Sequence, residues 1–308
     1  MHDLSSYQRM MVCLDLSGMD EVLLKYASMA AKVFGIDTVY FCHVVTSMEL
    51  PIEIANKYAG VKTPVDEVIE KEIEQSVQQH FVTPENTTTR VSIVSGKITD
   101  EIVKLSKTKL IDLLLFGRKK DFKSSGLDER KLVKGCPTSV ILVPEEPRPD
   151  LNQIMVSIDF SAHSLKAFEL GIALQKNSGA KLLSNHVYKV PTGYHSAGKS
   201  YEEFAEIMLE NTKKECQRFF GKMDMEGVDF DHTYMLDDDT KPADKIYASA
   251  KEADVDMIIL GSKGRSAAAA FLLGSVAEAL LVENEDIPLF IVKKTGENQS
   301  FIKTLINL

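Results

Sequence analysis

The sequence predicts an α/β protein built from two consecutive copies of one domain, each a doubly wound, five-stranded parallel sheet with helices on both faces. The first observation is an internal repeat: Asp15 and Asp159 lie 144 positions apart, as do Gly117 and Gly261. The second is that strand-like and helix-like segments alternate in each half, which favours parallel β-α-β units. The third is that the strands are continuous apolar runs, as expected when helices cover both faces of a sheet.

Four segments of the first half recur in the second half. The pairs are MVCLDLS (11–17) with IMVSIDFS (154–161), FCHVV (41–45) with LSNHVY (183–188), IDLLLFGRKK (111–120) with VDMIILGSKG (255–264), and SVILVP (139–144) with PLFIVK (288–293). The spacing holds until Gly117 and then grows by five, since Val143 corresponds to Val292. We interpret this shift as a local deletion of five residues in one loop of the first copy.

The elements of the second copy can be placed from hydrophobic patterning. Strands are expected near 153–159, 180–187, 230–236, 255–260 and 287–292, and helices near 162–178, 199–222, 241–253 and 268–284. Three prolines in PEEPRPD (144–150) interrupt both kinds of element and predict a linker. The expected domains are therefore 1–146 and 151–294. They are followed by an apolar tail, 295–308, that should pack on the body or on a partner chain.

The composition bounds the function. A net charge of −9 and a pI near 5.4 argue against broad nucleic-acid binding, which needs a basic face. The sequence has neither an apolar run long enough to span a membrane nor a signal peptide, so we expect no membrane association. The four cysteines form no CxxC pair and are expected to be buried free thiols in a reducing cytoplasm.

A glycine-rich segment follows the strand MIIL in the second copy and reads G-x2-G-x9-G-S, with Gly261, Gly264, Gly274 and Ser275 at the fixed positions. Glycines allow the backbone to approach phosphate oxygens and to adopt positive φ. Gly274 and Ser275 are expected at the N-terminus of the last helix, where unpaired N–H groups and the helix dipole favour an anion. Lys263 and Arg265 add positive charge.

This segment, the strand-end aspartate of IDFS and the HV pair that closes the second strand resemble the universal stress protein family, in a tandem form with two fused domains. The resemblance covers nearly the whole chain. It implies a Rossmann-like fold of the adenine nucleotide α-hydrolase type, a regulatory or stress-response role, and ATP, with or without Mg²⁺, as ligand. It also implies that the last strands of the two domains pair, here 139–143 with 288–292, and it leaves a homodimer open.

The same resemblance assigns roles to individual positions of the second copy. Asp159 would meet the ribose, and the backbones of Val187 and Leu260 would meet the adenine. The residues that would hold ribose and phosphates are Gly261, Gly264, Gly274, Ser275 and Val276, with Arg265 nearby.

The first copy departs from this pattern. Lys120 stands in place of Gly264, and alignment from the last strand puts Ser125 and Gly126 opposite Gly274 and Ser275, in inverted order. We interpret the first copy as a structural partner that cannot wrap a triphosphate.

Other functions stay open. A slow ATP hydrolase on the same fold is one alternative, although no residue stands out as catalytic and no Walker-type loop occurs. A module for an apolar or lipid-like ligand is another. His43 and His186 are expected to be satisfied strand-end histidines and not metal ligands, and the acidic run 237–239 a turn before a helix. The loop 191–199, with His195, either closes over a ligand or is a plain surface loop.

Overall fold

The structure is a computed structural model that describes residues 4–46, 65–119, 128–238, 240–264 and 273–293. These residues fall into two compact units, an N-terminal unit within Ser5–Pro149 and a C-terminal unit within Asp150–Lys294. We describe each unit by itself.

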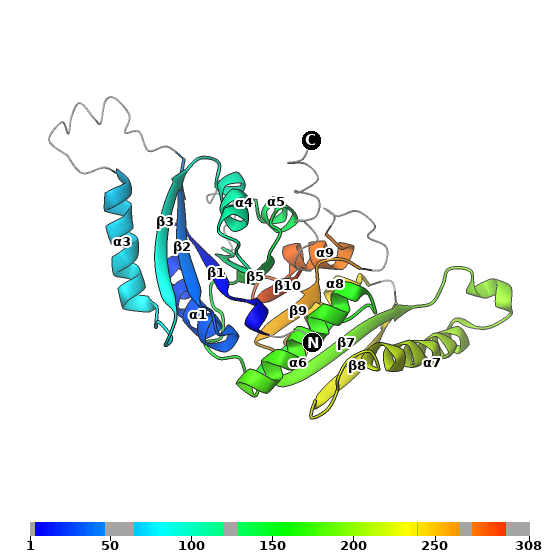
Figure 1. The fold of residues 1–308 in the computed structure, drawn as a ribbon. Helices are drawn as coiled ribbons and strands as arrows, with labels where there is room; N and C mark the ends of the chain where they lie inside the picture. Colours follow the sequence, from blue (N-terminus) through cyan, green and yellow to red (C-terminus); the bar gives the residue numbers. More distant parts are fainter. Residues whose placement is uncertain (1–3, 47–64, 120–127, 239, 265–272, 294–308) are drawn as a thin grey trace, which may run out of the picture. The chain divides into compact units, whose positions relative to one another are not determined.

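In the N-terminal unit, strands and helices alternate along the chain (Figure 1). The strands are β1 (Arg9–Leu14), β2 (Thr38–Val45), β3 (Thr88–Ser95), β4 (Leu113–Gly117) and β5 (Ser139–Val143). The helices are α1 (Met19–Phe34), α3 (Val65–His80), α4 (Ile98–Thr108) and α5 (Glu129–Gly135), and a 3-10 turn, η1 (Leu4–Ser6), precedes β1. Helix α1 packs on α3, β1 and β4, whereas α4 packs on α5 and β2.

The C-terminal unit repeats this arrangement. Its strands are β6 (Gln153–Ser157), β7 (Lys181–Lys189), β8 (Phe230–Asp237), β9 (Met257–Gly261) and β10 (Leu289–Val292). Its helices are α6 (Ala162–Ser178), α7 (Tyr201–Phe220), α8 (Pro242–Glu252) and α9 (Ser275–Glu283), with a 3-10 turn, η2 (Tyr194–Ala197), before α7. Helix α6 packs on β6, β9 and β10, and α8 packs on α9.

The two units share one strand order. It is β3-β2-β1-β4-β5 in the N-terminal unit and β8-β7-β6-β9-β10 in the C-terminal unit, with every pairing inside a unit parallel. The chain therefore winds outward in one direction from β1 or β6 and returns on the other side through β4 or β9. Ligands of such sheets bind at the carboxyl ends of the strands where this reversal occurs. The predicted fold class is confirmed.

Local signals explain why most predicted elements form where expected. Ser161 caps α6 by accepting the N–H of Ser164, and Gly179 ends the helix in a left-handed conformation. Ser200 and Glu203 form a capping box at the start of α7. The exception is the last helix, which we expected to begin at 268. It begins at Ser275, because residue 273 and the extended Gly274 lie outside the helix.

Candidate functional site

A sharp turn closes the first strand of the C-terminal unit. After β6, Phe160 adopts a left-handed backbone with φ 63°, and the N–H of Ser161 donates to Asp159 Oδ1 over 3.0 Å. The Phe160 ring stacks on His186 of β7 with ring centroids 4.2 Å apart. This turn places the Asp159 carboxylate at the carboxyl edge of the sheet, as predicted from the sequence.

The loop that begins at Gly261 packs against this turn. A Cβ atom on Gly264 would lie 2.8 Å from Asp159 Oδ2, and one on Gly274 would lie 3.2 Å from the backbone nitrogen of Gly264. The Gly274 N–H donates to the Ser262 carbonyl over 2.8 Å, and the Ser161 hydroxyl donates to the Lys263 carbonyl over 3.3 Å. The structure therefore brings Asp159, Gly264 and Gly274 into one cluster.

The conformation of these glycines corrects one expectation. Gly274 has φ −64° and ψ 147°, and Gly261 and Gly264 are likewise outside the left-handed region. These glycines are needed because neighbouring atoms lie too close for a side chain, and not because the backbone has a positive φ. At Gly261, for example, a Cβ would lie 2.6 Å from the His163 carbonyl carbon.

Gly274 is the N-cap of α9, and Ser275 and Val276 are its first two residues. The N–H groups of a first helical turn have no partner inside the helix, and they carry the positive end of the dipole. Because Gly274 touches the Lys263–Gly264 backbone, this helix end faces the same cluster as Asp159. The arrangement can receive an anion beside a carboxylate that accepts hydrogen bonds.

Val187 and Leu260 lie on the strands that flank β6. Ser157 of β6 pairs with Asn185 of β7 and with Leu260 of β9, and Val187 follows two residues beyond Asn185. Both positions therefore reach the edge where Asp159 lies. Arg265 falls outside the described residues.

The matched histidines are engaged with the main chain. His186 Nδ1 donates to the Ile158 carbonyl over 2.7 Å, and His43 Nδ1 donates to the Leu14 carbonyl over 2.9 Å. Each tethers the second strand of its unit to the end of the first, as expected for satisfied strand-end histidines. In the acidic run, Asp237 ends β8 and Asp238 pairs with Lys245 of α8 over 2.6 Å, whereas residue 239 is outside the described residues.

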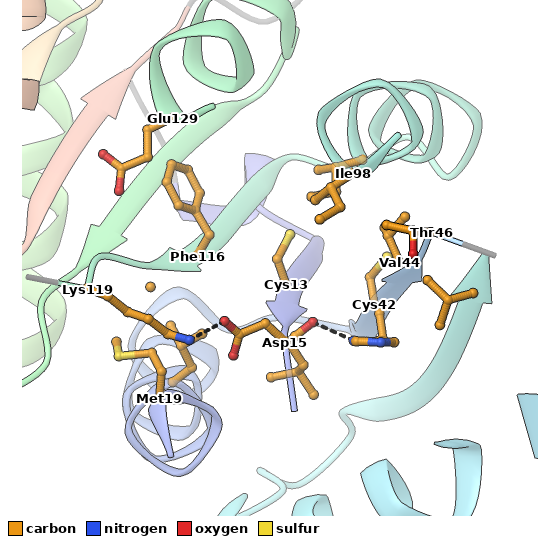
Figure 2. Close-up of a pocket in the computed structure, with 16 residues that line it drawn as sticks. Cys13, Asp15, Met19, Cys42, Val44, Thr46, Ile98, Phe116, Lys119 and Glu129 are labelled. Atoms are coloured by element: carbon orange, nitrogen blue, oxygen red, sulfur yellow. Dashed lines mark hydrogen bonds and ion pairs between the residues drawn. The ribbon is translucent and has the colours of Figure 1, made fainter. Parts of the chain in front are cut away.

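The N-terminal unit repeats the strand-end turn, with Leu16 left-handed at φ 58° after Asp15. The Asp15 carboxylate forms an ion pair with Lys119, which follows β4 (Figure 2). Burial alone would raise the pKa of Asp15, but the bonds from Lys119 and Ser17 hold it below its usual value. The carboxylate that corresponds to Asp159 is thus bound by the protein's own lysine.

The start of α5 corrects the alignment of the two loops. The N-cap of α5 is Asp128 and that of α9 is Gly274, so Asp128 and Glu129 occupy the positions of Gly274 and Ser275. Ser125 and Gly126, which the sequence alignment placed there, fall outside the described residues. Eleven positions separate Gly117 from Asp128, whereas thirteen separate Gly261 from Gly274.

The deletion is therefore not confined to one loop. Two residues are missing from the loop, two more from the helix, which has seven residues in α5 and nine in α9, and one from the connection to the last strand. Alignment from the last strand assigned all five to the loop because sequence offsets do not show where a helix begins.

Acidic side chains hold the first turn of α5. The Asp128 carboxylate accepts the N–H of Lys131 over 2.9 Å, as a capping residue does. Glu129 is buried and pairs with Arg118 Nη2 over 2.8 Å. Burial raises the pKa of Glu129, although the Arg118 charge pulls it down. In the N-terminal unit, carboxylates of the chain itself thus stand where the C-terminal unit offers a helix end to an anion.

Comparison with known proteins identifies the family. The universal stress protein family matches residues 6–144 and again residues 151–293, which is most of the chain. The chain belongs to the universal stress protein family. It is a tandem member, because each half matches the family separately.

Two universal stress proteins illustrate the relation. One from Methanocaldococcus jannaschii is 30% identical over 144 residues, which are 46% of this chain and 82% of that protein. One from Bacillus subtilis is 31% identical over 150 residues, which are 46% of this chain and 99% of that protein. A solved universal stress protein from Archaeoglobus fulgidus covers 94% of this chain and 99% of its own, with a TM-score of 0.62 and 20% identity, and so shares the fold.

Sequence reasoning missed three features of this universal stress protein: the Lys119–Asp15 pair, the buried Arg118–Glu129 pair and the Asp128 cap. One signal was available, since Asp128 followed by Glu129, shortly before the apolar pair Leu132 and Val133, is typical of a helix start. Lys119 and Asp15 are 104 positions apart, and Arg118 and Glu129 lie on either side of the loop between β4 and α5, so neither ion pair had a local signal. Among the described residues, no helix is both long and apolar enough to cross a membrane.

Proposed function

We propose that the C-terminal unit binds ATP, with or without Mg²⁺, and that nucleotide occupancy serves regulation in a stress response and not catalysis. The observation that carries the proposal is the convergence of Asp159, Gly264 and Gly274 at the carboxyl edge of the sheet. Side chains at the two glycines would fill the space beside the carboxylate and the end of α9.

Each part of the site has a role in this proposal. The Asp159 carboxylate accepts hydrogen bonds from ribose hydroxyls. The backbones of Val187 and Leu260 border the adenine, and the backbones of Gly261, Gly264 and Gly274 face the ribose and phosphates. The first turn of α9, with Ser275 and Val276, donates N–H groups to phosphate oxygens, and Arg265 adds charge.

Three variants test the proposal by calorimetric titration with ATP and with adenosine. Gly274→Val should abolish ATP binding, because its side chain would push against the Lys263–Gly264 backbone. Ser275→Ala should lose one hydrogen bond to a charged group, about 1.5–3 kcal/mol or about 10- to 150-fold in ATP affinity. Asp159→Ala should weaken ATP and adenosine alike, because its partner is the ribose.

The matched control is Asp15→Ala in the N-terminal unit, which should leave ATP affinity unchanged while circular dichroism confirms the fold of every variant. ATP binding that survives Gly274→Val, or that Asp15→Ala weakens as strongly as Asp159→Ala does, would refute the assignment. A phosphate-release assay on the same samples tests the regulatory role. Sustained turnover that Asp159→Ala abolishes would make the protein a hydrolase instead.

A further inference from the structure

The N-terminal unit contains a cavity of about 510 Å³ at the carboxyl edge of its own sheet (Figure 2). A volume in the range of about 300–1,000 Å³ is typical of small-molecule sites. The cavity is lined from the ends of β1, β2 and β4 and from α1, α4 and α5. Its lining residues include Asp15, Val44, Ile98, Ile102, Phe116 and Glu129.

Apolar side chains form one part of the wall. Ile102 and Phe116 are 2% and 1% exposed, and Val44 and Ile98 face the same space from β2 and α4. Cys13 and Cys42 also line it, and burial raises the pKa of both thiols, so they act as apolar surface. Such a wall suits a flat apolar body.

The charged groups of the cavity already compensate one another. Lys119 is the only lysine or arginine among the described lining residues, and it is bound to Asp15. Glu129 is held by Arg118 at 2.8 Å and lies at the end of α5 that corresponds to the anion-receiving end of α9. A phosphate entering here would meet the Glu129 carboxylate where it needs a donor, and the one cation among the described lining residues is already bound to Asp15.

We propose that this cavity binds an unphosphorylated nucleoside and rejects the corresponding nucleotide. Hydroxyl groups of the sugar would bind the Asp15 carboxylate, and the base would lie between Val44, Ile102 and Phe116. The choice of a nucleoside rests on the proposed function, because Asp15, Val44 and Phe116 correspond in register to Asp159, Val187 and Leu260. The rejection of phosphate rests on Glu129, whose position at the start of α5 corresponds to that of Ser275 at the start of α9.

The test uses the full chain with its isoleucine methyl groups labelled for NMR. Ile98 and Ile102 report on this cavity, and Ile158, which precedes Asp159, reports on the C-terminal unit. Adenosine at millimolar concentration should shift the signals of Ile98 and Ile102, whereas AMP should leave them in place. Absence of an adenosine shift at both residues, or an equal shift with AMP, overturns the inference. If the Ile158 signal does not shift on addition of ATP, by contrast, that result counts against the proposed function alone.

Two variants locate the effect. Val44→Phe fills the cavity and should abolish the adenosine shifts, whereas Val68→Phe, on the exposed side of α3, should leave them unchanged. If Val44→Phe fails to fold, the contrast between adenosine and AMP in the unaltered chain still decides the question. Adenosine shifts that persist in folded Val44→Phe would contradict the proposed location.

A further variant tests the role of the Glu129 charge. Glu129→Gln removes the negative charge that a phosphate would meet at the start of α5, so AMP should bind at least about tenfold more tightly while adenosine binds as before. Unchanged AMP affinity would show that Glu129 does not exclude phosphate, and would overturn that half of the inference.

Discussion

At Gly264 the missing side chain lets the Asp159 carboxylate approach the main chain, since a Cβ would lie 2.8 Å from Oδ2. The left-handed backbone of the site belongs instead to Phe160 and Leu16, in the two Asp-x-Ser turns. A non-glycine residue in this region is strained and persists only where its surroundings hold it. In the C-terminal unit, the stacking of Phe160 on His186 and the bond from Ser161 to Asp159 hold it.

Gly264→Ala should therefore weaken ATP and adenosine binding together, by about tenfold, because the new methyl group displaces the carboxylate. A loss of this size corresponds to about 1.4 kcal/mol. Calorimetry on the variant measures it, with Gly18→Ala in the N-terminal unit as the control for ATP, since nothing lies within 4 Å of a Cβ at Gly18. A loss confined to ATP would show that Gly264 faces the phosphates and not Asp159.

Asp20 should make the stability of the N-terminal unit depend on pH. Its buried carboxylate accepts the N–H groups of Asp15 and Leu16, each over 2.9 Å, and burial raises its pKa to about 6. Because folding raises the pKa of Asp20, its contribution to stability is fully present at pH values below its pKa in the unfolded chain, near 4. The contribution is lost as the pH rises through about 6. The loss should be about 2 kcal/mol.

Urea unfolding followed by circular dichroism at pH values from 4 to 7 checks this expectation. Asp20→Asn keeps one acceptor oxygen and removes the titration, so the difference between the two chains should grow over this interval in favour of the variant. A difference that is independent of pH would contradict the assignment to Asp20.

Elements with local signals could be predicted from the sequence. The bounds of α6 agree with the predicted 162–178, because Ser161 and Gly179 cap it by interactions within a few residues. The start of α9 could not be predicted, since the alanine-rich segment before Leu273 is typical of a helix. The Gly274 N–H instead bonds to Ser262, a contact with the preceding loop that no helical pattern reveals.

Helix α7 and strand β8 are joined by a partly buried pair that the sequence did not indicate. Cys216 Sγ lies 3.4 Å from His232 Nε2, and burial, with His186 nearby, lowers the pKa of His232 to about 4. A histidine whose pKa is lowered by folding stabilises the folded chain at pH values above its usual pKa, near 6.5. This stabilisation is lost as the pH falls toward 4.

Acidification from pH 7 to 4.5 should therefore destabilise the C-terminal unit by about 2 kcal/mol through this residue. His232→Phe keeps the ring among its aromatic neighbours Phe220 and Tyr234 and should remove that contribution. The measurement is the free energy of unfolding of both chains at the two pH values. An equal loss in both would place the sensitive group elsewhere.

The two units have one strand order and one kind of strand-end turn, and they differ in which charges occupy the ligand edge. The repeat could be predicted from the sequence because the spacing of matched strands survives. The difference between the sites could be predicted only in part. Lys120 and the shortened segment signalled a change, but the partners of Glu129 and Lys119 are set by the fold and not by a local pattern. The domain bounds and the pairing of the last strands stay predictions.

At this scale we expect one tight ATP site per chain, because carboxylates of the chain occupy the N-terminal edge. Calorimetric titration of the full chain should give a stoichiometry near one. Two equivalent sites would contradict the asymmetry, and Glu129→Gln should move the stoichiometry toward two if the carboxylate is its cause.

The Asp128 and Glu129 carboxylates have a consequence for a cell short of energy. The stability of the N-terminal unit does not depend on the nucleotide concentration, because its own carboxylates occupy the start of α5. The C-terminal unit, by contrast, would be stabilised by bound nucleotide, by about 2.7 kcal/mol when the nucleotide is at 100 times its dissociation constant. Under the proposed function, starvation would therefore loosen the C-terminal unit alone, and proteases would cut it first. In limited proteolysis, ATP should then slow the cleavage of the C-terminal unit and leave the cleavage of the N-terminal unit unchanged.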